Sequence, residues 1–292
     1  MSFEITTAFV QQYGSNVQLL SQQKGSRLRK CVREEPQVGK NGFYDQIGAT
    51  TARKRTERHG DTPLISTPHS RRRVTLVDYD WADLIDDLDK VKMLIDPESA
   101  YAKNAAFAMG RAMDDDIITA MTATAYTGET GATAVTFPAS QQIDISGTIT
   151  VPHLVQAKEM LDAAEVDEDM QRYFMCPSNI ITDLLAVTLV TSADYNAVKA
   201  LVEGKIDTYL GFKFKRSERL PLDRTTTGAA SGDRSCFAWV EDGVLLAMGK
   251  EPVPRIDERA DKNYSTQVYY SQAIGATRME EKKVVEVICQ EG

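Results

Sequence analysis

Three consecutive aspartates, Asp114, Asp115 and Asp116, are the residues most suggestive of chemistry, because divalent metal ions prefer carboxylate ligands. Their spacing argues against a metal site. The surrounding sequence predicts a helix, on which consecutive side chains point about 100° apart and cannot converge on one ion. Metal-binding helices place acids three or four residues apart, and residues 117–120 carry no acid. We therefore expect a solvated or intersubunit acidic patch.

Other catalytic patterns are also missing from the sequence. No histidine among His59, His69 and His153 pairs with a second ligand four residues away, and the four cysteines form no CxxC pair. The chain has no GxSxG, GxxxxGK[ST] or GxGxxG motif. We predict no catalytic residue, metal ligand or cofactor, and no enzymatic activity. The cysteines at 176, 236 and 289 are expected to be core residues in a reducing compartment.

The composition describes an ordinary globular protein without a membrane span. Of 292 residues, 42% are hydrophobic and 26% charged, and the net charge is −8. No apolar run approaches the roughly 18 residues that cross a bilayer, and the start lacks the pattern of a signal peptide. The negative charge disfavours a dedicated nucleic-acid binder, which must neutralise phosphates.

Charge is nevertheless distributed unevenly. Basic residues gather between 53 and 73, and acids crowd positions 78 to 89. Such segments are commonly solvated faces, but they can also be two halves of a contact between copies. We hypothesise that one set of side chains contacts the other on an adjacent copy. The basic set is Arg53, Arg55, Arg58, Arg71, Arg72 and Arg73, and the acidic set is Asp83, Asp86, Asp87, Asp114, Asp115 and Asp116.

The aspartate triplet lies in a predicted helix that spans residues 96–126. Asp96 can cap the first amides, and Pro97 suits the first helical position. Apolar and small residues recur at spacings of three and four. At about 1.5 Å per residue the helix would be roughly 45 Å long, which is enough to span a small domain.

The segment before this helix lacks the apolar residues of a core. Residues 40–80 predict an extended hairpin with its tip at Gly60–Pro63, which would need a neighbour to cover it. Residues 1–35 predict an N-terminal arm, with Phe9, Tyr13, Val17 and Leu20 at helical spacing.

A second α/β region is predicted from residue 147 onward. Helices are expected at 151–165 (Leu154, Ala157, Met160, Leu161 and Ala164 inward), from 178 (Ile181, Leu184 and Leu185 inward), and at 193–203. Strands are expected at 173–177, around Phe212 and Phe214, at 267–274 and at 284–289. Residues 222–235 predict an exposed loop, and Asp242-Gly243 predicts a hairpin turn between strands 236–240 and 244–248.

These segments, read in order, resemble the major capsid (coat) proteins of tailed double-stranded DNA bacteriophages, whose fold is named after phage Hong Kong ninety-seven. The resemblance covers nearly the whole chain. It rests on the segment from Gln11 to Arg29, on Asp96-Pro-Glu-Ser with the helix through Asp116, on Leu201 to Pro221, and on the final strands from Ala276.

The resemblance implies an α+β fold with five parts. They are an N-arm (1–35), an extended β-hairpin loop (40–80), a peripheral domain (81–146) with a spine helix (96–126), an α/β axial domain (147–275), and final strands (276–292) that return to the peripheral domain. It further implies a structural protein whose pentamers and hexamers form an icosahedral shell enclosing DNA without sequence specificity.

The implied partners are copies of the chain, a portal protein and, in some relatives, a decoration protein. The chain has no room for a built-in scaffolding segment, so a separate scaffolding protein is expected. The implied location is the virion capsid, after assembly in the host cytoplasm.

Two alternatives stay open at this point. An encapsulin-like cellular compartment shares the fold but encloses cargo enzymes. A nucleic-acid-binding protein could use the patch formed by Arg71, Arg72 and Arg73.

Overall fold

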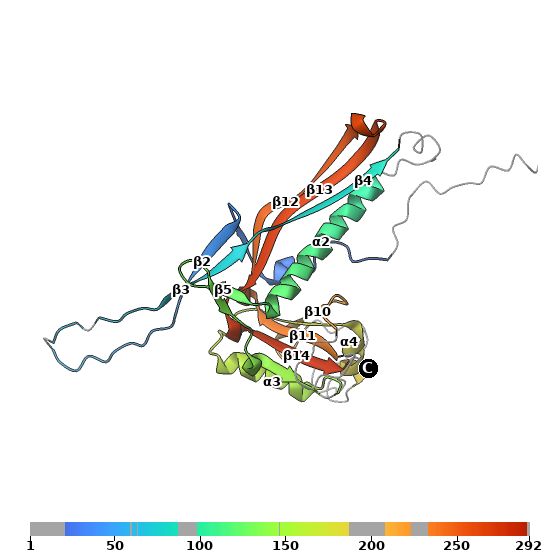
Figure 1. Cartoon of the computed structure of the whole chain (residues 1–292). Coiled ribbons are helices and arrows are strands. Elements are labelled where there is room, and N and C mark those ends of the chain that lie inside the picture. Colours follow the sequence, from blue (N-terminus) through green and yellow to red (C-terminus); the bar gives the residue numbers. More distant parts are fainter. Residues whose placement is uncertain are drawn as a thin grey trace, which may run out of the picture. The chain divides into compact units, whose positions relative to one another are not determined.

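A computed structural model describes residues 21–58, 60–62, 64–86, 98–145, 147–186, 208–222 and 233–290 (Figure 1). The chain forms two compact units. The first unit comprises Met1–Ser26, Asp78–Ala112 and Lys250–Ala273. The second comprises Arg27–Val77, Met113–Gly249 and Ile274–Gly292. Both units are assembled from segments distant in sequence.

The predicted long helix is confirmed as α2, Glu98–Thr122. It is shorter than the predicted range, because Ala125–Thr127 form strand β5 instead of a last helical turn. The proposed cap, Asp96 and Pro97, lies outside the described residues. In the first unit, Ala105 and Met109 pack against Ile85, Val268 and Tyr270, so small residues of α2 lie on a sheet.

That sheet has the strand order β1-β12-β13-β4. Its strands are β1 (Arg33–Pro36), β12 (Val244–Arg259), β13 (Ser265–Arg278) and β4 (Val77–Ile85). β1 runs parallel to β12, from the pair Arg33 and Leu245 to the pair Pro36 and Met248. The predicted strand at 267–274 is therefore confirmed within the longer β13.

The core of the second unit is a sheet with the order β7-β14-β11-β8-β10-β9. Every residue of β8 (Arg172–Cys176) and β11 (Asp233–Val240) is buried. Trp239 stacks on Tyr173 with ring centroids 5.5 Å apart, and Phe174 packs against Phe212 and Phe214. The remaining strands are β7 (Gln142–Asp144), β14 (Val284–Gln290), β10 (Phe212–Arg216) and β9 (Thr208–Tyr209).

Two helices accompany this sheet (Figure 1). α3 (Val151–Ala163) buries Leu154, Ala157 and Leu161, while Met160 and Ala164 are half-buried. α4 (Ser178–Ala186) buries Ile180 and Leu184. Ile181 was predicted to point inward but is only half-buried, since Ile180 takes the inward position beside the sheet. The predicted helix 193–203 lies outside the described residues.

A third sheet in the second unit has the order β2-β3-β5-β6. β2 (Asn41–Ile47) pairs antiparallel with β3 (His69–Thr75), and β5 (Ala125–Thr127) pairs with β6 (Thr133–Val135) through a turn at Gly128 to Gly131. Residues 48–68, which we name the arm, connect β2 to β3 as a long excursion (Figure 1). Every described arm residue is exposed, and none belongs to a helix or strand.

The predicted hairpin at Asp242-Gly243 is wrong. β11 and β12 flank this turn, but β11 pairs with β8 and β14, and β12 pairs with β1 and β13. The turn therefore connects two sheets. A Cβ atom at Gly243 would lie 2.9 Å from the Lys283 Cβ and 3.0 Å from its carbonyl oxygen, so glycine is needed for this close approach.

One further expectation also needs correction. Asp233, Arg234 and Ser235 were assigned to an exposed loop but are buried in β11, while residues 223–232 lie outside the described part. The final segment contributes β14, which pairs with β11 on one side and β7 on the other, and its predicted return to the peripheral domain stays a prediction. Single 3-10 turns occupy Arg29–Cys31, Ala139–Gln141, Glu241–Gly243, Ala260–Lys262 and Glu281–Lys283.

Candidate functional site

The three arginines of β3 point to opposite faces of their sheet. Side chains alternate along a strand, so Arg72 turns one way while Arg71 and Arg73 turn the other. The exposed fraction of the Arg72 side chain is 7%, against 41% for Arg71. The three consecutive arginines therefore do not form one basic patch, which removes the structural basis of the nucleic-acid alternative.

Arg72 belongs to a buried network at the base of the arm. Its Nε donates to the Met279 carbonyl oxygen at 2.8 Å, and its Nη2 donates to Glu281 Oε1 at 2.6 Å. Gln46 on β2 donates to the same Met279 carbonyl at 2.6 Å. These bonds tie both strands of the hairpin to the end of β13. Arg72 therefore bonds to groups of its own chain and does not face a partner.

The fully buried Arg278 continues this network. Its Nη1 donates to the carbonyl oxygens of Met121 and Ala123 at 2.9 and 3.0 Å, where α2 ends and leaves its last carbonyls unpaired. Burial lowers the pKa of Arg278, and the nearby Glu281 carboxylate opposes this effect. The base of the arm is thus held by buried hydrogen bonds.

The other face of the hairpin is exposed and combines aromatic rings with cations. The Arg71 guanidinium lies 3.1 Å from the Asp45 carboxylate and 5.8 Å from the Phe43 ring centre. The Arg73 guanidinium lies 4.6 Å from the Tyr126 ring centre. Phe43 and Tyr126 are 42% and 39% exposed. Exposed aromatic and arginine side chains are typical of the centres of protein interfaces.

The arm carries the remaining predicted cations, Arg53, Arg55 and Arg58, all of them exposed. Arg55 Nε donates to the Glu57 carbonyl oxygen at 2.8 Å. Large apolar side chains are exposed beside them, with Leu64 at 96% and Ile65 at 50%. Ile47, where the arm begins, is 70% exposed.

The predicted acidic patch on α2 is wrong for Asp114. Its side chain is buried, and its two carboxylate oxygens accept hydrogen bonds from the backbone amides of Arg27 and Leu28. Asp115 forms a two-bonded ion pair with Arg219, and Asp116 is half-buried. The helix points these carboxylates in different directions, as the spacing predicted.

The acids before α2 are only partly described. Asp83 accepts a hydrogen bond from the Leu84 amide at 2.9 Å and is half-buried. Asp86 is exposed, and Asp87 lies outside the described residues. No group of three or more His, Cys, Asp or Glu side chains suited to a metal occurs in the described part of the chain.

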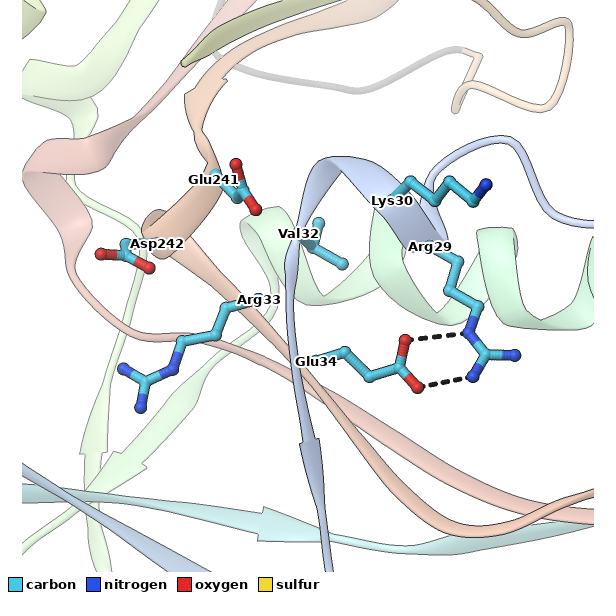
Figure 2. Close-up of a pocket in the computed structure, with 7 residues that line it drawn as sticks. All are labelled: Arg29, Lys30, Val32, Arg33, Glu34, Glu241 and Asp242. Carbon is cyan, nitrogen blue, oxygen red and sulfur yellow. Dashed lines mark hydrogen bonds and ion pairs between the residues drawn. The ribbon is translucent and has the colours of Figure 1, made fainter. Parts of the chain in front are cut away.

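Sequence reasoning missed a pocket of mixed charge beside β1 (Figure 2). Arg29 faces Glu34 with nitrogen-to-oxygen distances of 2.9 and 2.6 Å, whereas Arg33 extends away from this pair. The hydrogen bonds from Arg29 hold the pKa of Glu34 below its usual value. Lys30, Val32, Glu241 and Asp242 complete the lining. No sequence signal joins residues 29–34 to 241–242, because only folding brings them together.

The fold defines the class of protein. The chain is similar to the capsid of cyanophage P-SCSP1u, with 15% identity, 100% of this chain and 96% of that chain covered, and a TM-score of 0.77. The capsid of Ralstonia phage GP4 matches at 9% identity, 97% and 96% coverage and a TM-score of 0.75. The acid-stable capsid of Helicobacter pylori bacteriophage KHP30 matches at 10% identity, with 100% of this chain and 98% of that chain covered and a TM-score of 0.74. The predicted coat-protein fold is confirmed.

The sequence gives the more particular assignment. The sequence pattern of the family described as phage capsid protein matches residues 5–291, so the chain belongs to that family. It is therefore a structural shell protein and not an enzyme, and neither the compartment nor the nucleic-acid alternative is favoured. No curated protein sequence matches the chain. None of the described helices combines the length and apolarity needed to span a membrane.

Proposed function

We propose that copies of this chain form the pentamers and hexamers of a closed icosahedral shell around phage DNA, and that the arm of each copy lies on a neighbour. The exposed arm is the observation that carries this proposal. Its described residues have no covering structure in their own chain, yet they include Leu64 and Ile65. Covering such a side chain contributes about 1.5–3 kcal/mol, which a lone subunit forgoes.

The direction of this contact favours closed rings. An arm that meets a different surface on the next copy makes a head-to-tail contact, and such contacts generate rings when the rotation closes. Individual exposed ion pairs contribute only about 0–1 kcal/mol, but a shell repeats each pair many times. Weak contacts of this kind allow subunits to correct their positions during assembly.

The structure changes the set of side chains that we propose for this contact. Arg53, Arg55 and Arg58 on the arm remain, and so do Arg71 and Arg73 on the exposed face. The buried Arg72 and Asp114 leave the set. Asp115 leaves it as well, because Arg219 uses its carboxylate. Asp83, Asp86, Asp87 and the half-buried Asp116 stay as proposed acceptors.

We also propose roles for the two structural regions. The six-stranded sheet with α3 and α4 would form the axial domain around the five- and six-fold centres, and α2 with β4, β12 and β13 the peripheral domain. An electron-microscopy map of the particles tests this assignment. A six-stranded sheet placed at the rim of each pentamer or hexamer would contradict it.

Further partners belong to the same proposal. They are a separate scaffolding protein, a portal protein, a decoration protein and packaged DNA bound without sequence specificity, with assembly in the host cytoplasm. The net charge of −8 supports a container that does not grip its genome.

Reversing the arm charges tests the arm contact. The triple variant Arg53→Glu, Arg55→Glu, Arg58→Glu should fold but form no closed shells, because the exposed cations meet a neighbour and not their own chain. Negative-stain electron microscopy and sedimentation, with the scaffolding protein co-expressed, measure assembly. The matched control, Glu57→Lys with Asp61→Lys, reverses charge in the same segment and should assemble. Normal shells from the triple variant would refute the contact.

A further inference from the structure

Residues 22–28, which we name the strap, lie against α2. In the first unit, Arg111 Nη1 donates to Gln22 Oε1 at 2.8 Å and to the Gln23 carbonyl oxygen at 3.3 Å. Gln23 Nε2 in turn donates to the carbonyl oxygen of Gly25 at 2.9 Å. These bonds hold the backbone of the strap beside one turn of the helix.

Gly110 brings the two backbones into contact. A Cβ atom at this position would lie 2.5 Å from the Gly25 carbonyl carbon and 2.5 Å from the Ser26 nitrogen. Both atoms belong to backbone, so neither can rotate away. Glycine inside a helix is less stable than alanine, so α2 gives up helix stability here for a close crossing. This accounts for the glycine within a helix otherwise rich in alanine.

Asp114, one helical turn further along α2, anchors the end of the strap in the second unit. Its carboxylate accepts from the Arg27 amide at 3.2 and 3.0 Å and from the Leu28 amide at 3.2 Å. Hydrogen bonds to a buried carboxylate are among the strong ones, because the acceptor is charged. Arg27 Nη1 also donates to the Arg216 carbonyl oxygen at 2.8 Å.

Apart from Leu28 at its end, the strap contributes little to the hydrophobic core. None of the residues from Gln22 to Arg27 is buried, and Leu28 is the first that is. Opening the strap up to Leu28 would therefore break hydrogen bonds and expose little apolar surface. Local opening of this kind is separable from global unfolding.

We propose that Gly110, Arg111 and Asp114 make α2 a latch for the strap. The latch fixes the point at which residues 1–21 join the folded chain, and it is required for shell assembly but not for folding of the subunit. Gly110 admits the strap by having no side chain, and Asp114 sets its register by accepting the two amides.

Limited digestion with trypsin tests the latch on the soluble full-length chain. The strap contains cleavable residues, Lys24 and Arg27, and the exposed arm residues Arg53, Arg55 and Arg58 serve as an internal reference. Cleavage of a locally opened segment follows the population of the open form. The Cβ of Gly110→Ala would displace the strap backbone, and Asp114→Asn would lose the charge-assisted bonds, so each variant should raise strap cleavage relative to arm cleavage by about tenfold or more.

Matched controls separate the latch from general effects of substitution. Gly147→Ala places a Cβ in open space, and Asp115→Asn alters the neighbouring carboxylate, so neither should change the cleavage ratio. Thermal melting gives a second test, because the latch predicts that Gly110→Ala lowers stability, whereas an unobstructed helical glycine predicts a rise. Alanine at an unobstructed helical glycine raises stability, so a stabilised Gly110→Ala with an unchanged ratio would overturn the latch. If Gly110→Ala does not fold, the ratio of strap cleavage to arm cleavage in Asp114→Asn and Arg111→Gln tests the latch instead.

Electron microscopy of the same variants tests the role in assembly. Folded variants with an opened strap should yield few closed shells while the controls assemble normally. Normal shells with increased strap cleavage would refute the assembly role and keep the latch. The digestion needs no shell, so it stands even if the wild-type chain fails to assemble and the proposed function is refuted.

Discussion

The six-stranded sheet and the arm, both within the second unit, distribute apolar side chains in opposite ways. In the sheet, β8 and β11 bury every residue, including Arg172 and Asp233. In the arm, every described residue is exposed, including Leu64. The sheet is therefore complete within one chain, whereas the role that we propose for the arm requires a second copy. A shell subunit needs both properties, because it must fold before it assembles.

Three consecutive residues of β3 show the same contrast between side chains that belong to the fold and side chains that are exposed. Arg72 is buried and bonded to Met279 and Glu281, so it belongs to the fold. Arg71 and Arg73 lie on the opposite face, where each guanidinium lies over an aromatic ring, and we propose that they contact a partner. Residue type alone does not distinguish these roles, whereas strand alternation does.

The largest expected effect comes from the sheet. Phe174→Ala should lower the free energy of unfolding by about 3–5 kcal/mol, because it removes a fully buried ring from contact with Phe212 and Phe214. Leu64→Ala is the matched control in the arm and should stay within about 0.5 kcal/mol. Urea unfolding measures both. Equal losses would erase the distinction between sheet and arm.

An intermediate effect should separate the arginines. Arg72→Ala should cost about 3 kcal/mol, because it removes the buried partner of the Glu281 carboxylate and one of the two donors to the Met279 carbonyl. Arg71→Ala removes a 41% exposed side chain and should cost about 0–1 kcal/mol. The same urea titration compares them. A larger loss for Arg71 would mean that the faces of β3 are assigned the wrong way round.

The smallest effect concerns pH. Hydrogen bonds from Arg29 hold the pKa of Glu34 below its usual value in the folded chain. The pair therefore stabilises the fold above the ordinary glutamate pKa, and this contribution is lost as the pH falls through the lowered value. Wild type should lose slightly more stability than Glu34→Gln between pH 7 and pH 3, measured by urea unfolding. Identical pH dependence of the two proteins would show that the pair contributes nothing.

Local patterns in the sequence predicted local elements well. Phe212 and Phe214 alternate with lysines, and β10 buries these two residues as expected. The spacing of small residues likewise predicted α2. These signals depend only on neighbours along the chain, so the elements can be predicted without knowledge of the fold.

Pairing between distant segments could not be predicted in the same way. Asp242-Gly243 is typical of a hairpin, but the glycine is required by Lys283, forty residues away. The role of Asp114 depends on the amides of Arg27 and Leu28, whose position no local pattern indicates. The arm was the exception, since its lack of apolar residues already indicated that its own chain would not cover it.

The four cysteines give the proposed particle a further property. All four thiols are free and buried, and burial raises the pKa of Cys31, Cys176 and Cys236, which disfavours the reactive thiolate. A particle assembled in a reducing cytoplasm and released into an oxidising environment would therefore cross that change in redox potential with its native thiols shielded. Its cohesion would therefore not depend on the redox state of these four thiols.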